Sequence, residues 1–413
     1  THLPDVTVIV PVFLNDHDTP QARPQAYVAA RGHHADIGGI APGSMPPDST
    51  DIVQEGVRLN NVLLVDEGRF CERELRDLLS AGDYPARQPD RNIADLRAQL
   101  AACARGAQLL GDAARDFGSD VLTAFMGHVM DNGEAAVRKL LRGLAPGRFT
   151  YPMDNGAKVC VAITTDRETG SATFDFTGTS EQLAGNFNAP RAITRAAVLY
   201  ALRCLIDDPM PLNDGCLRPV IMRIPEGSML APMPPAAVVA GNVETSQVVT
   251  EAILAATRRL APAQGTMNNF TFGDATRQYY ETIAGGSGAG PDHPGTDAVQ
   301  THMTNSRLTD PVVLETRLPV RVDSFAIRTG SGGSGAQRGG NGVERKLTFL
   351  EPMRAQILAN RRLVPPRGLA GGSDALGGAT FVIRADGRED MLGSTDAADM
   401  APGDAIVICT PGG

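Results

Sequence analysis

Two short apolar segments near the beginning of the chain constrain its fold most strongly. Residues 6–13 (VTVIVPVF) form an apolar, β-branched run that is typical of a buried strand. Residues 26–31 (AYVAAR) return as a second short strand, and the polar, turn-rich residues 14–25 between them predict a loop. Strands of similar length that pair as a hairpin bring the segment before the first strand beside the segment after the second.

This geometry would gather the polar residues His2, Asp5, His33, His34 and Asp36 in one small volume. Two imidazoles and one carboxylate leave coordination positions open, which is the pattern of a catalytic site for Zn, Mn or Fe and not of a closed structural site. Such an ion can lower the pKa of a bound water and polarise a carbonyl. The residues alone leave open the alternative of loop histidines that are hydrogen-bonded to the backbone.

The apolar periodicity beyond this region predicts a mixed α+β chain. Helical spacing in residues 91–110 and 117–142 predicts two helices that pack as an antiparallel pair. Gly133 favours a break or kink in the second helix, because glycine in a helix interior costs about 1 kcal/mol relative to alanine. The further elements predicted are a strand pair at 158–164 and 171–177, helices at 191–206 and 245–260, a glycine-rich stretch of short extended runs at 279–345, and short strands toward the C-terminus.

A chain of 413 residues is long enough for two or three domains at roughly 150 residues each. We expect a multidomain chain with three parts, listed here in order. They are an N-terminal β-hairpin metal-site region with the helical pair (1–145), a mixed α/β substrate domain (146–325) and a β-rich C-terminal domain (326–413).

Composition excludes several functional classes. The formal net charge of -9 and the absence of a Lys/Arg run argue against a nucleic-acid-binding surface. The six cysteines are scattered without a CxxC pair, which predicts reduced cysteines in a cytoplasmic protein. No signal peptide and no long apolar span are visible in the sequence. Because the chain opens at Thr1, directly on the predicted metal motif, we expect a further segment upstream.

Two glycine clusters, 285–290 and 330–335, fit no dinucleotide, P-loop or nucleophile-elbow motif. They predict either close backbone approach to a ligand or tight turns in a β-rich region. Polar residues beside apolar segments are the other candidates for substrate contact, with internal turn and capping bonds as the alternative. The candidate substrate-binding residues are Gly286, Ser287, Gly288, Asn268, Asn269, Asn242, Glu244 and His302.

Several long strings together resemble the hydantoinase B and 5-oxoprolinase family of ATP-dependent cyclic-amide hydrolases. The resemblance extends from the first residue to the closing TPGG. The strings that carry it include THLPDVTVIVPVF, RGHHADIGGIAPGSMPPDST, FDFTGTS, PLNDGCLRPV, AVVAGNVETSQ, QGTMNNFTFG, YYETIAGGSGAGP, THMTNSRLTDP and RGGNGVERKLTFLEP.

The resemblance implies a partner of the hydantoinase A type, which binds ATP and Mg and phosphorylates a small cyclic amide such as 5-oxoproline or a hydantoin. This chain would then open the activated ring at a divalent metal held by His2, Asp5 and His33. His34 and Asp36 are expected to orient these ligands or to replace one of them in the catalytic site. The family's N-terminal portion, in which a further acidic residue is expected, does not precede the THLPD string here.

The family also includes ketone carboxylases such as acetone carboxylase, so a carboxylase subunit is an alternative function. A 2-His-1-carboxylate iron oxygenase is a second alternative, although the spacing His2-x-x-Asp5 differs from its usual compact H-x-D motif. A non-catalytic partner subunit whose histidines hold no metal is a third.

Overall fold

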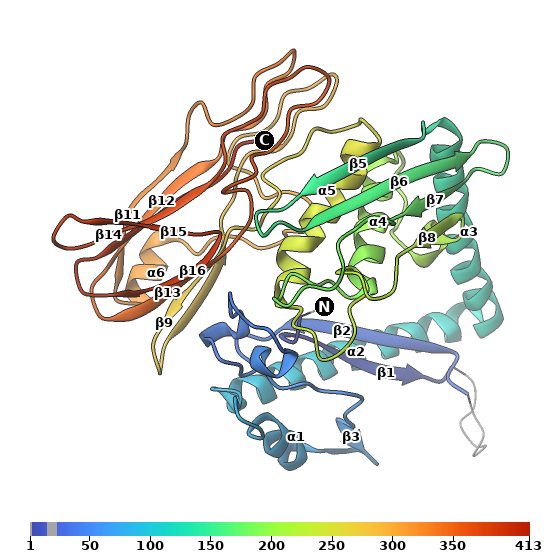
Figure 1. The fold of residues 1–413 in the computed structure, drawn as a ribbon. Helices are drawn as coiled ribbons and strands as arrows, with labels where there is room; N and C mark the ends of the chain where they lie inside the picture. The colour runs from blue at the N-terminus through green and yellow to red at the C-terminus, as the bar shows by residue number, and fades with distance from the viewer. Residues whose placement is uncertain (1, 15–22) are drawn as a thin grey trace.

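The computed structural model describes residues 2–14 and 23–413, and most of the predicted loop at 14–25 lies outside these residues. It shows a mixed α+β chain with several separate sheets, as the sequence predicts (Figure 1). The proposed limits of three domains at residues 145 and 325 stay a prediction. Three hydrophobic cores are formed by the described residues, and each is built largely from one stretch of the chain.

The N-terminal core forms under the predicted hairpin. β1 (Asp5–Val12) pairs antiparallel with β2 (Ala26–His33), and α2 (Pro89–Phe117) runs along one face of this ribbon (Figure 1). Val8 is buried together with apolar residues of α2, whereas Ile9, the next residue, is exposed, as the two-residue period of a strand requires. The remaining short elements of this region are η1 (Pro42–Ser44), η2 (Ile52–Glu55), β3 (Val65–Asp66), β4 (Arg69–Phe70) and α1 (Glu72–Leu79).

The two long helices differ from the prediction in their arrangement. α3 (Ser119–Gly143) follows α2 directly and contacts it, but it turns away from α2 and packs mainly on the 3₁₀ turn η3 (Asp214–Leu217), so the expected antiparallel pair is wrong (Figure 1). The break at Gly133 is also wrong, because the helix continues through it. A Cβ at this position would lie 2.7 Å from Oδ1 of Asn213, so glycine serves close packing here.

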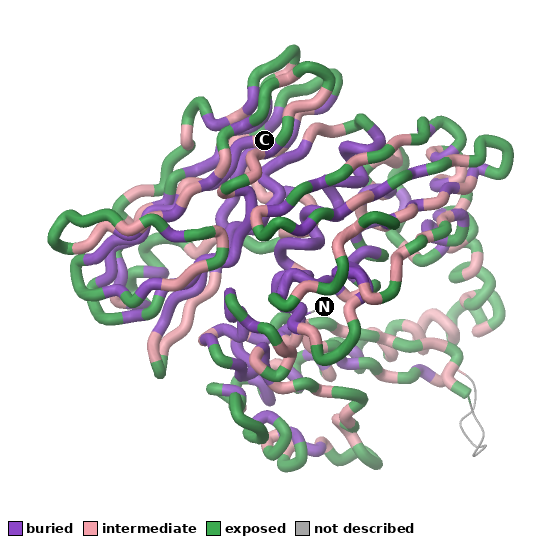
Figure 2. Tube along the Cα trace, in the orientation of Figure 1, coloured by how far each residue is buried: buried purple, intermediate pink, exposed green. Residues whose placement is uncertain are grey.

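The middle of the chain forms a four-stranded sheet with two helices. The strand order is β5-β6-β7-β8, antiparallel except for the last pair. The elements are β5 (Gly147–Pro152), β6 (Lys158–Asp166), β7 (Ser171–Asp175), α4 (Arg191–Leu205), β8 (Val220–Arg223) and α5 (Ser246–Ala256). Every residue of α5 is buried, because this helix packs between α4 and the β5–β6 hairpin (Figure 2). The predicted strand pair and both predicted helices are confirmed.

The C-terminal part consists of two sheets that enclose one core. The first has the order β10-β9-β13-β16 and the second β11-β12-β17-β14-β15, with all neighbours antiparallel. The helix α6 (Pro311–Arg317), which was not predicted, begins where Asp310 accepts the amide hydrogen of Val312. The strands are β9 (Asn269–Gly273), β10 (Gln278–Thr282), β11 (Val320–Ile327), β12 (Val343–Phe349), β13 (Met353–Leu358), β14 (Ala379–Ile383), β15 (Glu389–Leu392), β16 (Thr395–Met400) and β17 (Ala405–Cys409).

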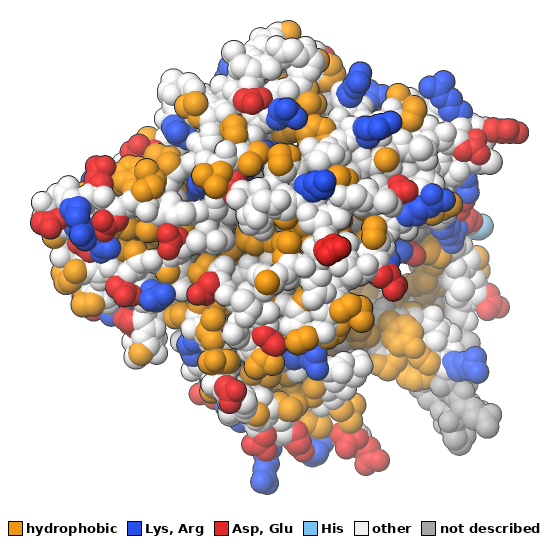
Figure 3. All heavy atoms as spheres, viewed as in Figure 1, with side chains coloured by type: hydrophobic (Ala, Val, Ile, Leu, Met, Phe, Trp, Pro, Cys, Tyr) orange, Lys and Arg blue, Asp and Glu red, His pale blue; other side chains and the backbone are white. Residues whose placement is uncertain are grey.

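The visible surface carries charges of both signs, interspersed over the face drawn in Figure 3. No broad single-sign area is visible on that face, in keeping with the net charge of -9. Among the residues that the structure describes, no helix combines the length and the apolar character needed to cross a membrane.

Candidate metal centre

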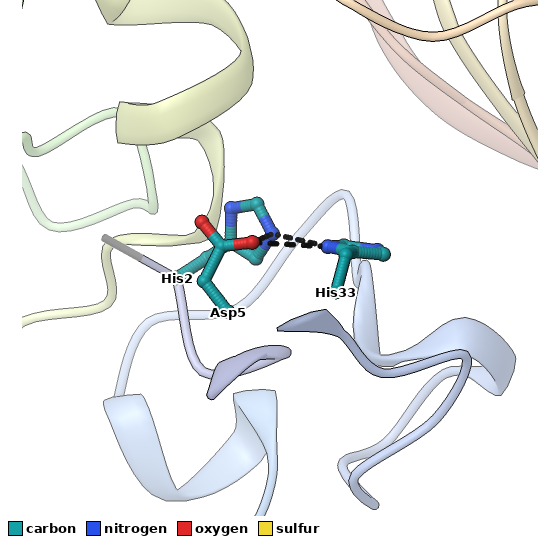
Figure 4. A group of neighbouring side chains, drawn as sticks. All are labelled: His2, Asp5 and His33. Atoms are coloured by element: carbon teal, nitrogen blue, oxygen red, sulfur yellow. Dashed lines mark hydrogen bonds and ion pairs between the residues drawn. The ribbon is translucent and has the colours of Figure 1, made fainter. Parts of the chain in front are cut away.

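The open end of the β1–β2 hairpin brings three potential ligands together. Asp5 and His33 are paired residues in the strand register, and His2 precedes β1 in a short turn (Figure 4). Nδ1 of His33 lies 3.2 Å from Oδ1 of Asp5 and 3.2 Å from Nε2 of His2. Nε2 of His2 lies 3.7 Å from Oδ1 of Asp5. The predicted cluster of His2, Asp5 and His33 is therefore formed, with one donor atom from each side chain pointing at the same place.

The electrostatics of these groups favour the forms that bind metal. Burial lowers the pKa of His2 to about 3, so its imidazole is neutral at neutral pH and has a free lone pair. Burial also tends to raise the pKa of Asp5, but its hydrogen bond with His33 and the neighbouring imidazoles outweigh that effect and hold the pKa below its ordinary value. A neutral imidazole and an ionised carboxylate are the protonation states that a divalent ion requires.

The donor atoms fit a divalent transition-metal ion in their spacing and chemistry. At metal–nitrogen distances near 2.1 Å and tetrahedral angles, neighbouring ligand atoms are roughly 3.4 Å apart, and the three observed separations bracket this value. His2 is 3% exposed, and its second ring nitrogen, Nδ1, has no hydrogen-bond partner among the described residues. Two nitrogens and one oxygen suit Zn, Mn or Fe and leave positions for water or substrate.

A π-helical turn from the middle of the chain completes one wall of the cluster. η4 (Gly241–Thr245) leads directly into α5, and Nδ2 of Asn242 in this turn donates a hydrogen bond of 3.2 Å to Oδ2 of Asp5. Because Oδ1 of Asp5 faces the two imidazoles, this bond fixes the rotation of the carboxylate. Single π turns occur frequently at functional sites, since they redirect a side chain within a helix.

Glu244 in the same turn begins a buried chain of hydrogen bonds. Its Oε1 accepts bonds from Nδ2 of Asn269 (2.7 Å) and from the hydroxyl of Thr266 (2.9 Å), whereas its Oε2 has no partner in the described part of the chain. Burial raises the pKa of Glu244 to about 8. Oδ1 of Asn269 accepts a bond of 2.8 Å from the hydroxyl of Tyr280, whose ring centroid lies 6.1 Å from that of His33. The network thus extends from Glu244 through Asn269 to Tyr280, whose ring lies beside His33 of the candidate metal centre.

Tyr280 is a residue of this site that the sequence analysis did not single out. Burial and the nearby carboxylates of Glu244 and Asp5 raise its pKa, so the phenol is neutral at physiological pH. It lies in the string YYETIAGGSGAGP, which supplied a family resemblance but no sign of a role. The only indication in the sequence was a pair of tyrosines in a short strand that is otherwise polar.

His34 and Asp36 have protein partners away from the three-residue cluster. His34 lies between the helix residues Gln99, whose Oε1 is 3.1 Å from Nε2, and Asn92, whose Nδ2 is 2.9 Å from Nδ1. The carboxylate of Asp36 accepts bonds from Gly38, Gly43 and Arg87, including one of 2.8 Å from the Arg87 guanidinium. His34 thus holds the loop after β2 against α2, whereas Asp36 holds this loop together and connects it to Arg87; the catalytic role of both residues stays a prediction.

Gly286, Ser287 and Gly288 lie in a loop whose backbone is packed against other backbone. A Cβ at Gly286 would lie 2.0 Å from the carbonyl oxygen of Gly340, and one at Gly288 would lie 1.8 Å from that of Ala261. The hydroxyl of Ser287 accepts a hydrogen bond of 2.7 Å from the amide of Thr296. These contacts match the tight-turn interpretation of the glycine cluster.

Asn268 and His302 are also surrounded by protein. The Asn268 amide donates to Gln264 and to the Ile283 carbonyl, and it accepts a bond of 2.7 Å from Arg362. Burial lowers the pKa of His302 to about 4, and its Nε2 lies 3.9 Å from Oε1 of Glu251. Of the eight candidate substrate-binding residues, the structure joins Asn242, Glu244 and Asn269 to the cluster by hydrogen bonds or through Tyr280.

Comparison with known proteins agrees with this fold and with the strings in the sequence. The chain is 44% identical to 5-oxoprolinase 1 from Arabidopsis thaliana over 100% of its own length, which is 34% of that protein. It therefore spans about a third of that relative. An ATP-dependent caprolactamase from Pseudomonas jessenii has the same fold, with a TM-score of 0.82 and 23% identity over 100% of this chain and 74% of that one. The nucleotide-free structure of an acetone carboxylase also matches, with a TM-score of 0.85 and 17% identity. The match covers 100% of this chain and 62% of the carboxylase chain. The model of the Hydantoinase B/oxoprolinase family matches residues 1–413, and the chain belongs to that family.

Proposed function

We propose that this chain is the metal-dependent, ring-opening part of an ATP-dependent cyclic amidase of the 5-oxoprolinase or hydantoinase type. The observation that carries the proposal is the convergence of His2, Asp5 and His33 at the end of the hairpin, with spacing and protonation suited to a divalent ion. Relatives named as 5-oxoprolinases and the fold shared with an ATP-dependent caprolactamase support the reaction class.

The side chains of this chain would have distinct tasks. His2, Asp5 and His33 would hold the ion, which when bound polarises a carbonyl and lowers the pKa of a water. Asn242 would keep the Asp5 carboxylate turned toward the ion through its hydrogen bond to Oδ2. Tyr280, held by Asn269, would form the wall beside His33 against which a small ring can lie.

The activating step would take place on a partner of the hydantoinase A type, with ATP and Mg. A simple amide carbonyl is a poor electrophile, and phosphorylation of its oxygen creates a leaving group before ring opening. The substrate would be a small cyclic amide such as 5-oxoproline or a hydantoin. Ring opening should therefore require both proteins, ATP and the metal.

Elemental analysis with matched variants tests the metal part of the proposal. The purified protein should contain a divalent transition metal, and His33→Ala and Asp5→Ala should lose it. His128→Ala is the control, because this histidine is exposed on α3 and forms an ion-pair contact with Asp131 at 4.0 Å, away from the candidate metal centre. Metal content that is unchanged in H33A, or a wild-type protein that binds no metal on titration, would overturn the site and favour a non-catalytic partner subunit.

A carboxylase subunit is the second candidate, supported by the fold shared with acetone carboxylase. The two functions differ in their co-substrates, since a carboxylase consumes bicarbonate and a ketone. Product formation from a cyclic amide with ATP, without bicarbonate, would favour the amidase. Oxygen uptake under the same conditions would instead indicate an iron oxygenase.

A further inference from the structure

A large cavity lies apart from the metal cluster, where the middle of the chain meets the C-terminal loops. Its volume is about 750 Å³, and none of His2, Asp5 and His33 lines it. The lining comes from the beginning of β5, the end of α5 and the residues after it, residues 289–291, the two loops 333–339 and 366–375, and Gly413. A cavity of this size falls within the range of 300–1,000 Å³ that small-molecule ligands occupy.

Four arginines line this cavity, and their charges are not neutralised by protein. They are Arg148, Arg258, Arg259 and Arg367. Within residues 2–14 and 23–413, none of these guanidinium groups has an ion pair or a side-chain hydrogen bond, and no Asp or Glu lines the cavity. The nearby Asp374 accepts the amide hydrogen of Gly368 through its Oδ1. In a chain with a net charge of -9, this is a marked local excess of positive charge.

The backbone at Arg258 is held in an unfavourable conformation. Its φ of 55° lies in the left-handed region, in the position after α5 where glycine or asparagine is usual. A side chain in this conformation costs on the order of 1 kcal/mol, because its Cβ approaches the following carbonyl oxygen. The C-terminus of α5 contributes about half a negative charge, which offsets only a small part of the four positive charges.

The two glycine-rich loops of the cavity present amide hydrogens without protein acceptors. In the described residues, the backbone N–H groups of Gly335, Ala336 and Gln337 have no acceptor, and neither do those of residues 369–371. The loops are nevertheless fixed to each other, since Ser334 donates its amide hydrogen to the Ser373 hydroxyl (2.8 Å) and Ser373 donates its own to the Ser334 carbonyl (2.8 Å). Free amides on a fixed loop bind the oxygens of anions such as phosphate.

Two partly buried apolar residues also line the cavity. Phe149 follows Arg148 along β5, and Leu260 follows Arg259 after α5; both are partly buried in the cavity wall. Phe149 offers the aromatic surface on which a planar organic group stacks. The ligand that fits the whole cavity therefore has an anionic end and an apolar or planar end.

From these features we propose that the cavity is a second ligand site, which binds an organic phosphate between the four arginines and the free loop amides. The guanidinium groups and amides would contact the phosphate oxygens, while the organic part lies against Phe149 and Leu260. Arginine forms paired hydrogen bonds with phosphate, which explains why no lysine is needed. The site is independent of the metal and of the ring-opening function proposed above.

Calorimetric titration of the purified protein without its partner, in a metal chelator and at low ionic strength, tests the proposal. The probes are ADP, a sugar phosphate, pyrophosphate and adenosine. ADP or the sugar phosphate should bind, whereas adenosine, which lacks phosphate, should not. Comparing the affinities of ADP and the sugar phosphate shows which organic group the cavity prefers. The affinity of pyrophosphate shows how much the anion contributes without an organic group. Binding should weaken at high ionic strength, because the contact is between charges.

Arginine variants provide the decisive comparison. Arg259→Gln and the double variant R148Q/R367Q should each weaken binding by about tenfold or more, the effect of losing a charge-assisted hydrogen bond. R58Q/R73Q is the matched control, because both arginines are exposed, lack ion pairs in the described part of the chain and lie outside the cavity. Circular dichroism should show that all variants are folded. Absence of binding by any phosphate at millimolar concentration, or equal loss in R58Q/R73Q, would overturn the proposal. H33A should bind the phosphate as the wild type does. Phosphate binding can therefore be judged even if the proposed metal site proves wrong.

Discussion

Asn242 donates its side-chain amide hydrogen to Asp5 over 3.2 Å, although the two residues are 237 positions apart. Asp5 lies at the beginning of the hairpin and Asn242 in the π turn before the buried helix α5. This bond connects the candidate metal centre, beside the N-terminal core, to the turn η4 that leads into the middle core. The orientation of the Asp5 carboxylate therefore depends on how the N-terminal core packs against the middle core.

Asn242→Ala should weaken metal binding by about 10- to 100-fold while the protein stays folded, because partners of metal ligands contribute roughly this much. Competition with a chelator of known affinity measures the change. Asn60→Ala is the control, since Asn60 is exposed in the loop before β3. Equal metal affinity in N242A and the wild type would show that Asp5 keeps its orientation without this bond.

His34→Ala should lower stability and leave the metal content unchanged. The substitution removes the acceptor of Asn92 and the donor to Gln99, and each unsatisfied buried polar group costs about 1–3 kcal/mol. Urea unfolding and elemental analysis on the same sample separate the two effects. Loss of metal at full stability would instead support the catalytic role predicted from the sequence.

The proximity of His2, Asp5 and His33 was predictable because it depends on local pairing. Two apolar runs of similar length predict a hairpin, and the hairpin alone places Asp5 opposite His33. His34 could not be assigned in this way, since neighbouring residues at the end of a strand point in opposite directions and its partners come from α2. Tyr280 and Asn242 come from distant parts of the chain, and no periodic pattern in the sequence reports their approach.

For the two long helices, too, the local structure could be predicted from the sequence but the tertiary packing could not. The helical character of residues 91–110 and 117–142 was readable from apolar spacing, but their packing was not, because α2 lies along the β1–β2 hairpin and α3 packs chiefly on the turn η3. The break predicted at Gly133 was wrong for the same reason. The glycine leaves room for the side chain of Asn213, which belongs to another segment and cannot be recognised from the sequence of the helix. Propensity describes an isolated helix, whereas tertiary contacts determine where a glycine is useful.

Gly288→Ala should destabilise the protein by about 2–3 kcal/mol, the usual cost of overpacking. The added Cβ would lie 1.8 Å from the carbonyl oxygen of Ala261, so the backbone of one of the two segments must move. Gly111→Ala is the matched control, because no described residue outside the backbone of its own helix lies within 4 Å of the Cβ position there, and alanine favours the helix. Thermal unfolding of both variants gives the comparison. A neutral G288A would mean that the loop is not held by backbone packing.

Glu244→Gln should flatten the pH dependence of stability between about pH 5 and pH 8. Burial raises the pKa of Glu244 from its ordinary value of 4.5 to about 8. Within this window the folded protein holds a proton that the unfolded chain releases, so the free energy of unfolding falls as the pH rises, with a slope of at most about 1.4 kcal/mol per pH unit from this group. Glutamine keeps an oxygen for Asn269 and Thr266 and does not titrate. Urea unfolding at several pH values measures the slope, and Glu226→Gln serves as the control because Glu226 is exposed. Equal slopes in E244Q and the wild type would show that Glu244 is ionised in the folded protein and that its unpartnered Oε2 does not carry the proton.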